Sequence, residues 1–100
     1  MVQEIIWSPE AIAAFSDIIA YLRETWSEKE VEQFADRVDE KLDVLKSHPE
    51  LGGIKNKKLN IRKTVIHKKV ILIYKYKPSK KEIHLLRFWN TLQDPRKNKY

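Results

Sequence analysis

Apolar residues recur at spacings of three and four through the first half of the chain, which is the pattern of amphipathic helices. The two apolar faces that this spacing defines consist of Ile12, Phe15, Ile19, Leu22 and Trp26, and of Val31, Phe34, Val38, Leu42 and Leu45. Ser8 and Ser27 stand where N-caps are expected, and Pro9 suits a first helical position. Since almost no linker separates the two faces, we expect an antiparallel helical hairpin that ends at His48, before Pro49.

The second half of the chain changes to runs rich in Val, Ile, Tyr, Phe and Trp, which favour strands. We predict strands at residues 59–66, 70–77 and 82–90, joined by short turns at 67–69 and 78–81, and a first strand at residues 2–7. Short connections imply an antiparallel meander. Residues 49–58 are predicted to be a mobile, basic loop, and 91–100 an irregular tail. The predicted fold is α+β: an N-terminal strand, the hairpin, then a three-strand antiparallel meander, with the helices covering a four-stranded sheet in one domain spanning 1–100.

Acidic and basic residues are concentrated in different halves of the chain. Residues 1–50 carry five Lys and Arg against twelve Asp and Glu, whereas residues 51–100 carry fifteen against two. A basic surface attracts phosphate backbones or an acidic protein, so we expect the second half to hold the working surface. The chain has no cysteine, which excludes a disulfide framework and a thiolate nucleophile. It shows neither a signal-peptide pattern nor a membrane-spanning run, so we expect a cytoplasmic protein that contacts no membrane.

Six short segments, in order, carry a resemblance to a known family. They are Trp7-Ser8-Pro9, Tyr21 with Trp26, His48-Pro49-Glu50-Leu51-Gly52, Asn60-Ile61-Arg62, Ile71-Leu72-Ile73-Tyr74, and Phe88-Trp89-Asn90-Thr91-Leu92-Gln93-Asp94-Pro95. Together they resemble the RelE/ParE family of toxins from bacterial type II toxin–antitoxin modules, over essentially the whole chain. The resemblance implies growth inhibition, a role in plasmid stabilisation and neutralisation by a cognate acidic antitoxin. RelE-like members cut messenger RNA on the ribosome, whereas ParE-like members poison DNA gyrase without bond chemistry.

Cleavage of RNA needs positive groups for the phosphate and groups that move protons. The resemblance makes Arg62, Lys58 and Tyr100 the candidate catalytic residues. Arg62 has a second interpretation, in which it pairs with an acidic residue or with the C-terminus. Two positions count against an efficient nuclease, because Ile71 and Leu92 stand where many relatives that cut RNA have arginine.

Further cations supply a surface for binding a target. The candidates for contact with nucleic acid or a target protein are Lys57, Lys68, Lys69, Arg87 and Arg96. The three histidines lack the spacing of metal ligands, so we expect neither a metal nor a cofactor. Three hypotheses follow: a ParE-like toxin that acts by binding gyrase or another target, a RelE-like ribosome-dependent endoribonuclease, and a non-toxic basic module that binds RNA or protein. The two missing arginines favour the first or the third.

Overall fold

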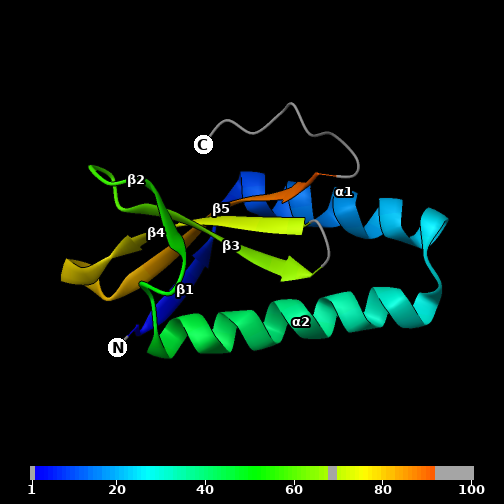
Figure 1. Ribbon diagram of the computed structural model, residues 1–100, viewed down its shortest axis with the longest axis horizontal. Coiled ribbons are helices and arrows are strands. Elements are labelled where there is room, and N and C mark those ends of the chain that lie inside the picture. Colours follow the sequence, from blue (N-terminus) through cyan, green and yellow to red (C-terminus); the bar gives the residue numbers. More distant parts are fainter. Residues whose placement is uncertain (1, 68–69, 92–100) are drawn as a thin grey trace.

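Two helices lie against one face of a five-stranded mixed sheet (Figure 1). The computed structural model describes residues 2–67 and 70–91. In chain order the elements are β1 (Glu4–Trp7), α1 (Pro9–Thr25), α2 (Glu28–Ser47), β2 (Gly53–Asn56), β3 (Ile61–His67), β4 (Val70–Lys77), the 3-10 turn η1 (Pro78–Lys80) and β5 (Glu82–Asn90). The strand order is β1-β5-β4-β3-β2. β1 is parallel to β5, and the other neighbours are antiparallel. The predicted α+β class, helical hairpin and antiparallel meander are confirmed.

The helices begin at the serines that the sequence indicates. Ser8 Oγ accepts the N–H of Ala11 at 3.0 Å, and Ser27 Oγ accepts the N–H of Glu30 at 3.2 Å. Each bond satisfies an amide that has no partner within the first helical turn. α2 ends as predicted before Pro49, where His48 donates its N–H to Val44 at 2.8 Å. The end of α2 therefore lies where the chain turns back towards the sheet.

The core lies between the helices and the sheet. Phe34 of α2 and Leu72, Tyr74 and Leu85 of the central strands are fully buried there. Near β1, an aromatic group consists of Trp7, Phe15 and Phe88, whose ring centroids are 5.4 to 5.6 Å apart. Burial of such side chains supplies most of the stabilisation of a small domain.

The loop prediction for residues 49–58 was wrong in its middle part, because Gly53–Asn56 forms β2. The sheet consequently has five strands rather than the four expected. Glycine, lysine and asparagine have weak strand propensity, so Ile54 alone in this segment favoured a strand. Its partner β3 supplies the hydrogen-bonding edge, with Gly53 opposite Lys63 and Ile54 opposite Arg62.

Two boundaries also differ from prediction. β3 begins at Ile61, two residues later than expected, because Lys57 and Asn60 close a turn through an N–H···O bond of 3.2 Å. The predicted turn at 78–81 contains η1 and ends at Lys81, whose φ of 54° is left-handed. Predictions for residues 68, 69 and the tail 92–100 fall outside the described residues. Within the described part, no helix is long and apolar enough to cross a membrane.

Candidate functional site

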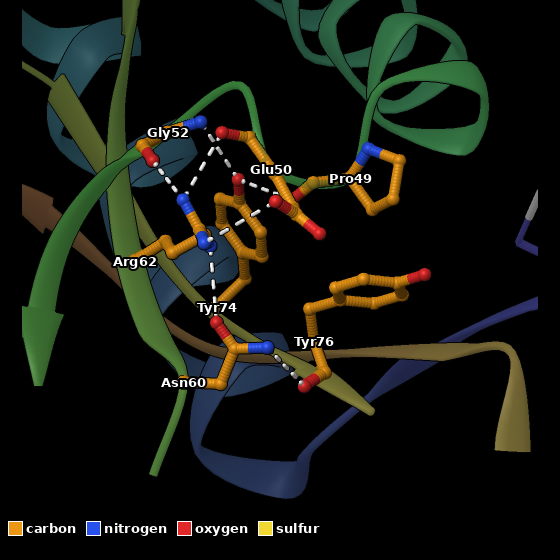
Figure 2. A network of polar contacts seen from close by, with 7 residues as sticks. All are labelled: Pro49, Glu50, Gly52, Asn60, Arg62, Tyr74 and Tyr76. Carbon is orange, nitrogen blue, oxygen red and sulfur yellow. Dashed lines mark hydrogen bonds and ion pairs between the residues drawn. The ribbon is translucent and has the colours of Figure 1, made fainter. Parts of the chain in front are cut away.

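The segment that follows α2 is attached to the sheet by two side chains, Arg62 and Tyr74 (Figure 2). These residues are directly opposite each other in β3 and β4, so both side chains leave the sheet on the same face. This is the face that the helices cover, and residues 49–52 lie against it just beyond the end of α2. The sheet register therefore places a guanidinium and a phenol side by side against one loop.

Arg62 donates hydrogen bonds to the loop and to a neighbouring side chain. Its Nη1 donates to the carbonyl oxygens of Glu50 and Gly52, at 3.0 and 2.9 Å, and its Nε donates to Asn60 Oδ1 at 3.1 Å. Its Nη2 lies 3.9 Å from Glu50 Oε2. The Arg62 side chain is 13% exposed and that of Glu50 is 69% exposed, so the ion pair itself contributes little. The interpretation in which Arg62 pairs with an acidic residue agrees with this contact, but the shorter contacts are to the backbone oxygens of Glu50 and Gly52 and to Asn60 Oδ1.

Tyr74 makes the second attachment. Its hydroxyl accepts the N–H of Gly52 at 2.9 Å and donates to the carbonyl oxygen of Pro49 at 2.9 Å. Burial raises the pKa of this phenol above the usual 10.0, although the Gly52 N–H and the positive charge of Arg62 act in the opposite direction. Tyr74 therefore remains neutral at physiological pH and keeps the proton that it donates to Pro49.

Gly52 is required at its position by close approach rather than by backbone conformation. A Cβ atom at Gly52 would lie 2.7 Å from the Tyr74 hydroxyl and 2.8 Å from the Lys63 carbonyl oxygen. At Gly53, a Cβ would meet nothing within 4 Å. Of the two adjacent glycines, Gly52 alone permits this contact between the loop and the sheet.

Asn60 connects the network to β4. It has a φ of 54°, a left-handed conformation that asparagine tolerates better than most residues. Its Nδ2 donates to the Tyr76 carbonyl oxygen at 3.1 Å, while its Oδ1 accepts from Arg62. The sequence prediction gave Asn60 no role beyond its place in the segment Asn60-Ile61-Arg62 and missed this one. The spacing Asn-Ile-Arg, at the start of a strand, is the one signal that could have indicated it.

The other predicted site residues are spread over the molecule. Lys57 and Lys58 lie exposed in the turn before β3. Arg87 lies on β5, and its Nη1 is 3.2 Å from Glu10 Oε1 in the first turn of α1. The remaining candidates lie outside the described residues: Lys68, Lys69, Arg96 and Tyr100. No group of three or more metal-binding side chains occurs in residues 2–67 and 70–91.

A comparison with protein families identifies the family of this chain. Residues 5–95 match the model for the ParE toxin of type II toxin-antitoxin system, parDE. The chain belongs to the ParE toxin family. A comparison with individual curated proteins finds no match. The matched span includes the whole Arg62–Tyr74 network, so this network is part of the ParE-family domain. Membership confirms the expected RelE/ParE resemblance and gives the chain the class of a toxin from a type II toxin–antitoxin system.

Proposed function

We propose that this toxin inhibits growth by binding a target protein, with DNA gyrase as the first candidate, and that a cognate antitoxin neutralises it. The observation that supports the proposal is that most hydrogen-bond donors of Arg62 are occupied within the protein itself. Its Nε and Nη1 donors are bonded to Asn60 Oδ1 and to the carbonyl oxygens of Glu50 and Gly52. Arg62 thus fixes a loop instead of presenting these donors to a ligand.

A nuclease site would need the opposite arrangement. Stabilising a crowded phosphate requires donors that point, before the reaction, at the position where negative charge develops. Ile71, which stands where many RNA-cutting relatives have arginine, pairs with Val65 on β3 and Trp89 on β5. This part of β4 therefore supplies an aliphatic side chain and no positive charge. Both observations support action by binding.

Ribosome-dependent cleavage of messenger RNA is the second candidate. It is favoured by Lys57 and Lys58, which are exposed in the turn next to Asn60 and can follow a phosphate backbone. It is also favoured by Arg62 Nη2, which faces Glu50 Oε2 at 3.9 Å, beyond hydrogen-bond distance. A displaced Glu50 side chain would leave that nitrogen for a phosphate oxygen.

Induced expression tests the proposal. The toxin gene is induced with and without its neighbouring antitoxin gene, and growth, plasmid supercoiling and messenger RNA 5′ ends are measured together. We expect growth arrest without antitoxin, inhibited supercoiling by purified gyrase, and intact messages. Arrest accompanied by new, ribosome-dependent 5′ ends would establish the nuclease. Arrest with intact messages and normal supercoiling would direct the search to another protein target. Normal growth at high levels of folded protein would exclude both kinds of toxin and leave the non-toxic module.

A further inference from the structure

The two edge strands of the sheet, β1 and β2, differ in their protection against pairing with another strand. Each contains four residues, so length does not distinguish them. β2 carries Lys55, and its pairing with β3 shifts register between Ile54 and Asn56; lysine and such bulges are devices that block strand addition. β1 pairs with β5 in continuous register and contains no lysine and no proline. Of the two edge strands, β1 is therefore the less protected.

The free edge of β1 presents backbone hydrogen-bonding groups. Glu4 and Ser8 donate their N–H groups towards β5, to the carbonyl oxygens of Lys81 at 3.4 Å and Leu85 at 3.1 Å. Backbone groups alternate in direction along a strand, so the N–H groups of Ile5 and Trp7 point away from β5. Among the described residues, the only strand paired with β1 is β5.

A groove runs between this edge and α2. Its volume is about 400 Å³, and Ile5, Trp7, Leu42, Asp39, Asp43 and Lys46 line it. Ile5 and Trp7, whose N–H groups point outward, therefore also form the apolar floor of the groove, together with Leu42. Asp39 and Asp43 are one helical turn apart on α2 and form an acidic rim. Lys46 lies 4.0 Å from Asp43 and offsets one of the two negative charges, so Asp39, Asp43 and Lys46 together leave the rim with one net negative charge.

We propose that an extended segment of a partner protein, in which Lys or Arg alternates with aliphatic residues, adds to β1 as a further strand. Its backbone bonds to Ile5 and Trp7, as in other cases of strand addition. Every second side chain then enters the groove. A long basic side chain satisfies both halves of the groove, because its aliphatic stem covers Trp7 and Leu42 while its charged end reaches Asp39. This binding site is separate from the Arg62 loop and does not depend on the proposed target.

A second copy of the chain fits this groove less well. Pairing of β1 with β1 would bring in residues 2–7, which contain Glu4 and no Lys or Arg, and so would add no positive charge opposite Asp39 and Asp43. The β2 edge of a second copy has Lys55, but its register shift opposes strand pairing. Charge and edge geometry therefore favour a different, basic protein segment.

The test is a titration of the purified, isotope-labelled full chain with the peptide acetyl-Val-Arg-Val-Arg-Val-Arg-Val-amide, followed by NMR and by amide hydrogen exchange. We expect shifts and slowed exchange at the amides of Ile5 and Trp7, and no change at Ile54 in the other edge strand. The same peptide with Glu in place of Arg should bind at least about tenfold more weakly, since its charges repel the acidic rim.

Matched variants locate the contact. The double variant Asp39→Asn/Asp43→Asn should weaken the Arg peptide about fivefold, whereas Asp17→Asn/Glu24→Gln, which removes the same charge from exposed positions of α1, should change it less than about twofold. Ile5→Pro removes one outward N–H and leaves the bonds of Glu4 and Ser8 to β5, so it should abolish binding in a folded protein.

Four outcomes would overturn the proposal. They are equal binding of the Arg and Glu peptides, protection at Ile54 in place of Ile5, equal weakening by the two double variants, and sedimentation as a dimer whose contact shields the Ile5 amide. If Ile5→Pro does not fold, the two surface double variants still decide the question. All of these measurements use purified protein, so they stand whether or not the growth assay identifies a target.

Discussion

The Tyr74 hydroxyl accepts the N–H of Gly52 at 2.9 Å, across 22 positions of the sequence. This bond attaches the segment that follows α2 to β4, a central strand of the sheet. Without such attachment the segment would be an ordinary surface loop. Arg62 holds the carbonyl oxygens of the same segment. The segment is thus fixed through both its N–H and its C=O groups, and four measurable consequences follow from that.

Removal of the Tyr74 hydroxyl should destabilise the fold. Tyr74→Phe leaves the N–H of Gly52 and the carbonyl oxygen of Pro49 without their buried partner, which costs about 1–3 kcal/mol in the free energy of unfolding. Urea denaturation measures this loss. Tyr76→Phe is the control, since the Tyr76 hydroxyl makes no hydrogen bond within the described residues; an equal loss in both variants would refute the role of the Tyr74 bonds.

Alkaline pH should act on the same bonds. The pKa of Tyr74 is raised in the folded state, so above pH 10 the unfolded chain loses this proton before the folded protein does. The contribution of Tyr74 is complete below pH 10 and declines as the pH rises towards the folded-state pKa. The difference in unfolding free energy between the wild type and Tyr74→Phe should therefore shrink as the pH rises above 10, and a constant difference would contradict the shift.

The two glycines should respond differently to the same substitution. Gly52→Ala forces its new methyl group against the Tyr74 hydroxyl and the Lys63 carbonyl oxygen, and such overpacking costs about 1–3 kcal/mol. Gly53→Ala places its methyl group in open space and should be nearly neutral. Thermal unfolding of the pair is a matched comparison, in which equal melting temperatures would show that the loop moves freely away from the sheet.

Arg62 should affect toxicity through stability. Arg62→Ala removes three hydrogen bonds from a charged donor and should lower the free energy of unfolding by at least about 2 kcal/mol. Toxicity should fall with it and return at lower growth temperature, where the folded fraction is larger. Lys63→Ala, at the exposed neighbouring position, should leave both properties unchanged.

A variant Arg62→Ala that is folded yet non-toxic at every temperature would have another explanation. It would show that Arg62 contacts the target or the substrate directly. Arg62→Lys separates charge from geometry, since lysine keeps the charge but cannot span the oxygens of Glu50, Gly52 and Asn60. We expect it to resemble Arg62→Ala.

The local elements could be predicted from the sequence because their signals are local. The periodic faces of the helices and the serines at Ser8 and Ser27 each act within one turn of helix. The strand β2 could not be predicted, because only Ile54 of its four residues favours a strand and the segment forms one where β3 offers an edge. Strand propensity of this kind is a property of the neighbouring strand as much as of the segment itself.

The candidate site was predicted in its residues but not in its contacts. The resemblance indicated Arg62 as a candidate, and the structure places it in a network of polar contacts. Two of the three hydrogen-bond acceptors of Arg62 are backbone oxygens, of Glu50 and Gly52, and their position depends on the path of a loop that side-chain patterns do not describe. Hence the sequence indicated an arginine of interest without showing that most of its donors are occupied.

The pairing of the first strand with the last affects how the protein folds during its synthesis. Ser8 Oγ donates to the carbonyl oxygen of Leu86, 78 positions later, and all of β1 pairs with residues of β5. A growing polypeptide on the ribosome has neither the partner of β1 nor the main support of α1 until β5 has been made. Such long-range closure is slow compared with local folding. The cell that makes this toxin consequently has an interval, at the end of each round of synthesis, before the finished molecule can act.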